Sequence, residues 1–448
     1  MSKEAESNKA KKQLVILGGS FAGVSAAHYL LRHAIPQLPD PSSYQIVLVS
    51  SSSEGFCRPA SPRAALSDDF LPQDKLFVNI PAQFARYPKG SFRFVHGTAV
   101  DLDISSRSVT VRPAGASDND GATPLELSFY ALVIATGAEA ASPLLGLTKS
   151  NDADALRANW AAFRKVLPSA KEIVIAGGGP AGVELAGELG EYLNGRRGFF
   201  SCGQSDPKVS ITLVSATSRI LPALRPSIGQ QAEKYLGDLG VRVVKNTRAV
   251  PKTQQGQGQS SASSGVHEEV TSKTTVVLTP DADKPGSGTR SEVIEADLFI
   301  PCVGTTPNTW FVRDKSLLAS DGRVETNPET LRVDKAGPGA RIYALGDAST
   351  FVAQPSIYHL QMAVPFLCAN IKRDLLLAAG AQPAPAADRL FKADAREAGL
   401  VPIGRSKGVG AVMGYKLPSF LVWLFKGRDY FVSMLAPVWT GEKWAKEA

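Results

Sequence analysis

The sequence predicts an α/β protein with parallel sheets, and three observations carry that prediction. Apolar strands alternate with helices along most of the 448 residues, which is typical of parallel sheets joined by crossover helices. A glycine-rich turn follows an apolar strand at residues 14–23, and a second turn of the same kind occupies residues 173–182. Because the strand–turn–helix pattern occurs twice, we expect two similar domains, the second inserted in the first.

The first domain is expected to contain a strand at 14–17, a helix to about residue 32, and strands at 45–49, around 92–109 and at 130–137. The last of these is a continuous apolar run that stops at a glycine, which is typical of a strand covered on both faces. Residues 151–168 are expected to form a linking helix.

The second domain repeats this order, with a strand, a helix and further strands at 173–176, 181–193, 210–214, 241–245 and 274–278. Segments 253–265 and 281–291 are rich in loop-forming residues and are expected to be flexible hairpin loops. Two more buried strands are predicted at 298–304 and 341–347. The chain is thus divided into a disordered N-terminus (1–12), a first domain in two parts (13–150 and 291–370), a second domain inserted between them (151–290) and a C-terminal interface or membrane-facing segment (371–448).

The composition bounds the class of protein. The charged and hydrophobic fractions of 20% and 44% are those of a soluble globular protein. A net charge of +7 with scattered Lys and Arg favours a slightly basic surface or attraction to anionic lipid, with no sequence-specific nucleic acid partner. The four cysteines lie far apart and the histidines lack ligand spacing, so we expect no metal site and a reducing compartment. The charged N-terminus and short apolar runs predict neither a signal peptide nor a transmembrane helix, and hence a cytoplasmic chain.

Each glycine turn has the features of a phosphate site, because glycine lets the backbone approach a pyrophosphate at the N-terminus of a helix. The second turn carries the full pattern, Gly177, Gly179 and Gly182. The first turn differs, since Ser20 occupies the second glycine position, and its hydroxyl is itself able to bond a phosphate. Its contact residues are expected to be Gly18, Gly19, Ser20, Phe21, Ala22 and Gly23.

The acid that usually binds the ribose hydroxyls at the end of the second strand is missing from both halves. In the second half that position is Ser215, and Arg219 follows four residues later. Without a carboxylate to repel a 2′-phosphate, this pair slightly favours NADPH, with dual use of NADH and NADPH still open. Arg219 as a plain surface residue is equally open.

Two further motifs make a family resemblance specific. The strand at 130–137 ends in Thr136-Gly137, and residues 342–348 contain Gly346-Asp347. With both glycine turns, in this order, the chain resembles the two-dinucleotide-domain flavoproteins of the pyridine nucleotide–disulfide reductase fold over about residues 13–434. The resemblance implies FAD on the first turn, with Asp347 on its ribitol, and NAD(P)H on the second.

A missing cysteine pair and the C-terminal segments indicate the branch of the family. Disulfide reductases have a cysteine pair after the second strand, where this chain has only Cys57, so electrons are expected to leave the flavin directly. Segments 408–414 and 426–431 resemble the apoptosis-inducing-factor homologues, including the ferroptosis-suppressor quinone reductases and fungal relatives. That resemblance implies FAD contacts for Arg63 and Ala99. It also implies a peripheral membrane location, such as the mitochondrial outer face or lipid droplets.

Two residues are candidates for the chemistry. Glu184, on the first turn of the helix after the second glycine turn, is the candidate for contacting the nicotinamide, against the alternative of a carboxylate that merely favours the helix dipole. Lys426, in the family-like C-terminal segment, is the candidate for approaching the flavin or the acceptor, against that of an interfacial lysine.

The C-terminal residues 417–435 carry apolar side chains at helical spacing with nearby cations. An amphipathic membrane surface and a core or homodimer-interface helix are both compatible with this pattern.

The sequence thus predicts an FAD-dependent NAD(P)H oxidoreductase that delivers electrons to a quinone-type acceptor. Two alternatives remain open: a flavoprotein whose redox state controls an interaction with a partner, and a pathway-specific oxidoreductase acting on a small aromatic metabolite.

Overall fold

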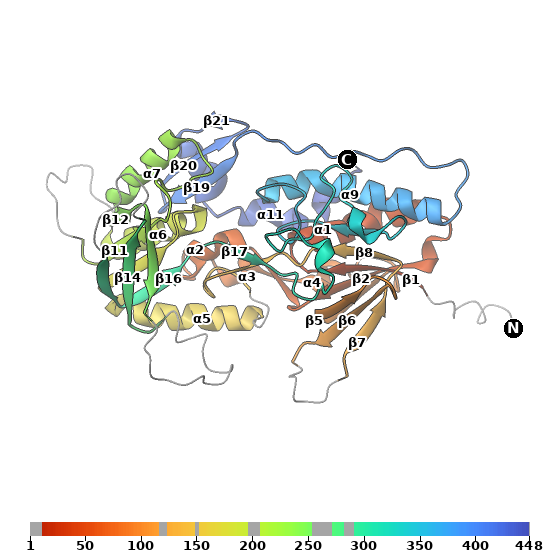
Figure 1. Cartoon of the computed structure of the whole chain (residues 1–448), viewed down its shortest axis with the longest axis horizontal. Coiled ribbons are helices and arrows are strands. Elements are labelled where there is room, and N and C mark those ends of the chain that lie inside the picture. Colours follow the sequence, from red (N-terminus) through yellow and green to blue (C-terminus); the bar gives the residue numbers. More distant parts are fainter. Residues whose placement is uncertain are drawn as a thin grey trace.

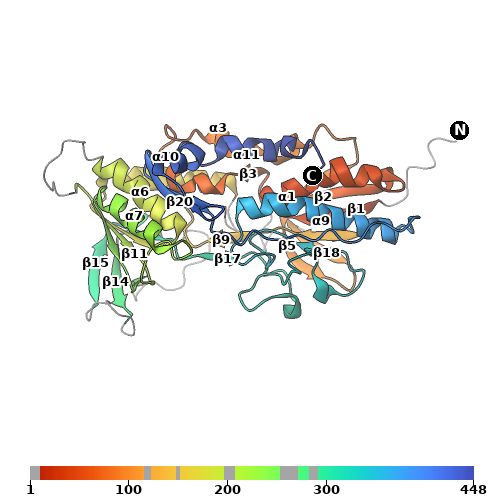
Figure 2. The same cartoon turned by 90° about the horizontal axis from the view of Figure 1, so that it is seen from above.

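The computed structural model describes residues 11–115, 123–147, 152–195, 207–252, 271–281 and 291–447. Nearly all of the two predicted hairpin loops and of the predicted disordered N-terminus lies outside these residues. The molecule is elongated, with one sheet toward each end (Figures 1 and 2). Among the described residues, no helix combines the length and apolar character needed to cross a membrane.

The first sheet has seven strands in the order β18-β8-β1-β2-β5-β6-β7. Their bounds are Ile342–Ala344, Ala131–Ile134, Lys12–Leu17, Tyr44–Ser50, Phe92–Asp103, Ser108–Pro113 and Leu125–Ser128. The strands from β18 to β5 are parallel, and β6 and β7 extend the sheet antiparallel. Helices α1 (Phe21–Tyr29) and α9 (Ile357–Ala378) lie side by side over one face (Figure 2), so the predicted parallel α/β architecture is confirmed.

The second sheet is parallel, in the order β12-β11-β10-β16, with bounds Val241–Val244, Ser210–Val214, Glu172–Ala176 and Leu298–Pro301. Helices α6 (Pro180–Asn194) and α7 (Pro226–Gly237) cover one face. An antiparallel sheet packs on the other face through a separate apolar cluster. Its strands are β13 (Thr247–Pro251), β14 (Thr274–Pro280) and β15 (Glu292–Ala296).

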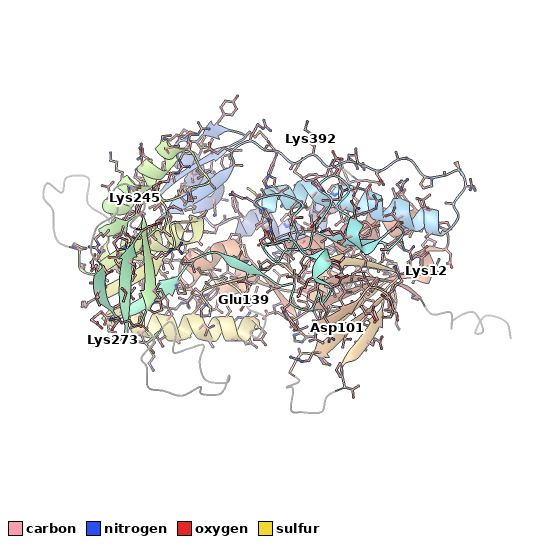
Figure 3. The ribbon with its side chains drawn as sticks, in the orientation of Figure 1. Lys12, Asp101, Glu139, Lys245, Lys273 and Lys392 are labelled. Atoms are coloured by element: carbon pink, nitrogen blue, oxygen red, sulfur yellow. The ribbon has the colours of Figure 1, made fainter. Side chains whose placement is uncertain are left out.

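The chain passes between the halves at two paired segments. β9 (Ala138–Ala140) and β17 (Thr305–Pro307) are antiparallel to each other, and Glu139 on β9 is labelled between the halves in Figure 3. Because β15 and β16 pair within the second half, the chain returns to the first half only after residue 301, later than the predicted division at 290/291. Helix α9 runs without a break through the predicted division at 370/371.

Smaller elements connect the halves. Helix α5 (Ala153–Val166) confirms the predicted linking helix, and its Trp160 packs against Phe56 and Phe77. The other short elements of this region are β3 (Glu54–Phe56), α2 (Ser61–Ala64), α3 (Gln73–Leu76), β4 (Phe77–Asn79) and α4 (Ile80–Gln83).

The C-terminal residues bridge both halves. After α9, residues 379–398 run along the surface, where Figure 3 labels Lys392, to a three-stranded sheet beside α6 and α7. That sheet contains β19 (Gly399–Ile403), β20 (Lys407–Val412) and β21 (Tyr415–Lys416). The helices α10 (Ser419–Val422), η8 (Trp423–Gly427, a π-helix) and α11 (Val432–Trp439) follow, and α11 packs on α1.

The predicted helical stripe is present at Phe420, Leu421, Leu424 and Phe425 in α10 and η8, but the segment 417–435 as a whole is not one helix. Tyr430 and Phe431 have φ angles of 53° and 68° and separate η8 from α11. Two consecutive non-glycine residues in the left-handed region cost about 1–3 kcal/mol each. The surrounding contacts therefore have to hold this break in place.

Candidate active site

The first glycine turn is shaped by close backbone contacts. A Cβ on Gly18 would lie 2.2 Å from the Ala135 carbonyl oxygen, and one on Gly23 would lie 1.9 Å from that of Gly18. The turn is thereby pressed against the end of β8 and leads directly into α1. Ser20 is exposed, is the N-cap residue of α1, and makes no side-chain capping hydrogen bond, so its hydroxyl fits the phosphate contact that was predicted.

The second turn has the same construction with one difference. A Cβ on Gly177 would lie 2.1 Å from the Cys302 carbonyl oxygen, and one on Gly182 would lie 2.0 Å from that of Gly177, so neither position can carry a side chain. A Cβ on Gly179, the counterpart of Ser20, would meet nothing within 4 Å. The backbone at Gly179 is therefore accessible, and it lies at the N-terminus of a helix of 15 residues. This arrangement fits a dinucleotide pyrophosphate.

The residues after the second strands also correspond. A Cβ on Gly19 would lie 2.5 Å from Ser50 Oγ, and one on Gly178 would lie 2.6 Å from Ser215 Oγ. Ser215 is buried and its hydroxyl lies 3.0 Å from that of Thr217. The Arg219 guanidinium donates to the Pro222 carbonyl oxygen at 2.7 Å. The structure therefore places Ser215 at the second turn, with Arg219 on the loop just beyond it.

The motif Thr136-Gly137 joins the first turn to the crossing segments. Thr136 Oγ1 donates to the Asn308 carbonyl oxygen at 2.7 Å, and the Asn308 amide donates back to the Thr136 carbonyl oxygen at 3.1 Å. Gly137 has φ +66° and its carbonyl oxygen accepts from the Asn308 backbone. Asn308 was not predicted as a site residue, although it directly follows the second crossing strand.

Gly346 and Asp347 also lie against the first turn. A Cβ on Gly346 would lie 3.4 Å from that of Ala22, so α1, β8 and the segment after β18 converge at one point. Desolvation raises the pKa of Asp347, while Arg58, with Nη1 3.7 Å from Asp347 Oδ2, opposes the shift. The Asp347 side chain is nonetheless 47% exposed. An accessible carboxylate beside the first turn fits the ribitol contact implied for it.

Arg58 was missed by sequence reasoning, which selected Arg63 from the same segment. The Arg63 side chain is buried and ion-paired with Glu188 at 2.7 Å. Its Nη1 donates to the Gly427 carbonyl oxygen at 2.6 Å. In this structure its donors are directed to protein groups, and Arg58 is the arginine beside Asp347.

Ala99 lies in β5 at a bulge where it pairs with Val111, and it is buried in the core cluster under the sheet. Its backbone is part of the strand ladder. The adenine contact implied for it stays a prediction.

The two predicted catalytic residues meet although 242 positions separate them. Lys426 Nζ lies 2.5 Å from Glu184 Oε1 and donates to the Leu400 carbonyl oxygen at 3.1 Å. Both side chains are nearly buried, at 11% and 4% exposed. Desolvation raises the pKa of Glu184 to about 7, although Lys426 lowers it. A carboxyl group with such a pKa exchanges its proton near neutral pH, as is common at functional sites.

Helix α6 carries two more buried carboxylates on the same stripe. Glu188 pairs with Arg63, and Glu191 pairs with Arg405 at 2.7 Å. Sequence reasoning selected Glu184 alone. The available signal was the spacing of the three glutamates, four and then three residues apart in an otherwise apolar helix, because residues at such spacings share one face of the helix.

Comparisons with known proteins identify the family and the fold. The profile of the family described as pyridine nucleotide-disulphide oxidoreductase matches residues 12–365. The oxidoreductase phnG of Penicillium herquei is 52% identical over 442 residues, covering 99% of both chains. The ferroptosis suppressor protein 1 of Xenopus tropicalis is 26% identical and covers 94% of both chains.

A solved structure shows the same fold at low identity. The sulfide:quinone oxidoreductase of Aquifex aeolicus superposes with a TM-score of 0.64 at 14% identity, covering 96% of this chain and 92% of its own. The chain belongs to the pyridine nucleotide-disulphide oxidoreductase family, as an oxidoreductase whose cofactors are FAD and NAD(P)H.

Proposed function

We propose that the protein takes electrons from a reduced nicotinamide and passes them through FAD directly to a quinone-type acceptor. The observation that carries this proposal is the Glu184–Lys426 ion pair, which joins the start of α6 to the C-terminal segment. The residues just before Lys426 expose apolar side chains. One point of the molecule thus combines a group that exchanges protons, the helix of the nicotinamide turn and a surface suited to an apolar acceptor.

The chain's own contribution is positioning and proton exchange. The turn at 177–182 and the N-terminus of α6 would hold the nicotinamide dinucleotide, and the turn at 18–23 with Asp347 would hold FAD. When bound, these cofactors supply hydride and electron transfer. Glu184 holds or releases a proton at its carboxyl group near neutral pH, and Lys426 donates a hydrogen bond to it.

The acceptor class rests on the surface around η8. Phe420, Trp423, Leu424 and Phe425 are 63%, 37%, 44% and 43% exposed. Exposed Lys416 and Arg428 flank them. Large apolar side chains beside cations suit the headgroup region of a membrane with anionic lipid. An isoprenoid quinone dissolves in the hydrocarbon layer of such a membrane, next to this region. The name of the sulfide:quinone oxidoreductase with the same fold supports this acceptor class.

Direct transfer is supported by the cysteines. Cys57, Cys302 and Cys368 are free thiols, and burial raises the pKa of Cys57 and of Cys302 to about 12. Such thiols are poor nucleophiles at neutral pH. Among the cysteines that the structure describes there is no disulfide, which supports transfer from the flavin itself to the acceptor.

Anaerobic mixing of the FAD-loaded protein with NADH or NADPH, followed by a short-chain ubiquinone analogue, tests the proposal. Rapid bleaching of the flavin and rapid recovery with the quinone are expected, with slower recovery in oxygen. A flavin that is reduced but not reoxidised by quinones would refute the acceptor class, and reoxidation by a small aromatic metabolite would replace it. Flotation with anionic vesicles tests whether this surface binds a membrane. The wild type should float with the vesicles, and the double variant Phe420→Ser, Phe425→Ser should not.

A further inference from the structure

Arg63, Glu188 and Tyr430 form a buried group next to the Glu184–Lys426 pair: Glu188 lies one helical turn after Glu184, and Tyr430 lies four residues after Lys426. Arg63 Nε donates to both carboxylate oxygens of Glu188 at 3.1 Å, and Nη2 donates to one of them at 2.7 Å. The Tyr430 hydroxyl donates to Glu188 Oε1 at 2.9 Å. Its ring centroid lies 4.7 Å from the Arg63 guanidinium carbon. All three residues are buried, so this arrangement is fully desolvated and each partner depends on the others.

The same arginine also fixes the backbone around Lys426. Nη1 donates to the carbonyl oxygens of Gly427 and Arg428 at 2.6 and 3.3 Å, and Nη2 donates to that of Gly404 at 3.2 Å. Gly427 directly follows Lys426 at the end of the π-helical turn. One side chain of α2 therefore ties together α6, the turn after β19 and the residue next to Lys426.

The backbone that it fixes is strained. Tyr430 and Phe431 adopt left-handed φ angles immediately after this turn, and the Tyr430 amide donates to the Lys426 carbonyl oxygen at 2.6 Å. Strain of this kind persists where the surroundings over-determine the conformation. The Tyr430 hydroxyl and ring, both held by the buried group, are those surroundings.

We propose that Arg63, Glu188 and Tyr430 are positioning residues that hold Lys426 against Glu184, and so set the reaction that depends on that pair. This inference rests on the proposed function for the kinetic outcome and on geometry alone for the position of Lys426. It assigns Arg63 a role different from the FAD contact that was predicted for it.

The charges around Glu184 give the direction of the effect. Lys426 lowers the pKa of Glu184, Glu188 raises it, and Arg63 lowers it, while desolvation is the largest cause of its rise. Tyr430 also lies within this field, and burial raises its own pKa well above the ordinary value, so that its hydroxyl stays a donor. If Lys426 moves away from Glu184 while the other charges stay, the pKa of Glu184 must rise.

Arg63→Lys is the sharpest test, because it keeps the positive charge beside Glu188 but cannot serve all the carbonyl oxygens at once. The matched control is Arg405→Lys, which makes the same change at the Glu191 pair, one turn further along α6. Tyr430→Phe removes only the hydroxyl and covers the case in which Arg63→Lys fails to fold.

Two readouts separate this inference from the proposed function. In the protein as purified, without added nicotinamide, acetylation of Lys426 followed by mass spectrometry should be several times faster in Arg63→Lys and Tyr430→Phe than in the wild type or in Arg405→Lys. In the FAD-loaded protein, the pH at which flavin reduction by NADH or NADPH changes should shift upward by about one pH unit. Folded variants with unchanged labelling and an unchanged pH profile would overturn the inference. A wild-type flavin that neither nicotinamide reduces would refute the proposed function, while the labelling still tests the positioning.

Discussion

The helices that follow the two glycine turns begin alike but are buried by different means. All nine residues of α1 are buried, and its partners are α9 and α11, whose Trp439 lies 4.5 Å from Phe21 between ring centroids. Helix α6 instead buries three carboxylates, each paired with a group from the C-terminal segment or α2. Helix α1 is thus packed mainly by apolar and aromatic contacts, whereas α6 depends on paired charges.

Each helix carries one group whose ionisation burial shifts. Desolvation lowers the pKa of His28 on α1 to about 4, and it raises that of Glu184 on α6 to about 7. His28 is therefore neutral above about pH 4, whereas Glu184 changes its protonation near pH 7. Acid is thus expected to lower the stability of the first half through His28 and the activity of the second half through Glu184.

Asp347→Ala should have the largest effect and should break the first half alone. Without the carboxylate assigned to the ribitol, the purified protein should be largely free of flavin, as read from the ratio of flavin to protein absorbance. Circular dichroism should show a retained fold, because the side chain is nearly half exposed. Full FAD occupancy would refute the assignment of Asp347.

Glu184→Gln should break the second half and leave the flavin in place. The rate of flavin reduction should fall about a hundredfold, and the change in rate near pH 7 should disappear because the amide does not titrate. Stopped-flow reduction across pH 5–9 measures both. Glu191→Gln, equally buried on the same helix, is the control that should keep the change near pH 7.

His28→Gln should sharpen the comparison through stability. His28 Nε2 lies 2.9 Å from the Trp439 carbonyl oxygen and Nδ1 lies 2.8 Å from the Tyr87 hydroxyl, while Arg32 and Arg86 further disfavour its charged form. Because the folded pKa is lowered from 6.5, stability is full above pH 6.5 and is lost as the pH falls toward 4. The loss is about 3 kcal/mol.

Urea unfolding at pH 7.5 and pH 5 measures this effect. The wild type should show the larger drop, and the His28→Gln variant a smaller one. Equal drops in the two proteins would contradict a neutral buried His28.

Ser215→Glu should change the choice of nicotinamide. A carboxylate at the end of the second strand repels a 2′-phosphate, so the ratio of kcat/KM for NADPH over NADH should fall about tenfold. Ser50→Glu, at the matching position of the first half, should leave that ratio unaltered. If the ratio stays constant in Ser215→Glu, that position does not lie at the ribose.

Gly179→Ser should have the smallest effect, because it makes the second turn a copy of the first. A side chain there meets no protein atom within 4 Å, so folding should be unaffected and the KM for the nicotinamide should rise about threefold. Gly182→Ser is the contrasting variant, since its Cβ would lie 2.0 Å from the Gly177 carbonyl oxygen. A fully folded Gly182→Ser protein would refute this account of the turn.

Much of the fold was predictable because its signals are local. The strand expected at 210–214 is observed as β11 over those residues, and the strands at 45–49 and 274–278 are each longer by two residues. The helical stripe predicted in the segment 417–435 ends with η8, since Tyr430 and Phe431 adopt left-handed conformations where Tyr430 contacts the distant Glu188. Two observations bear on the predicted divisions at 290/291 and 370/371: β16 still pairs with β10 in the second half, which depends on tertiary packing, and α9 continues past residue 370.

The sequence by itself determined the two turns, their order and the candidates Glu184, Lys426 and Asp347, because glycine spacing and motif order are properties of neighbours in the chain. Only the tertiary structure decided what those candidates touch. It joined Lys426 to Glu184 across 242 positions, placed Arg58 rather than Arg63 beside Asp347, and enclosed Arg63 with Glu188 and Tyr430. The physical reason is that a buried charge needs a partner, and which partner is near depends on how distant segments pack.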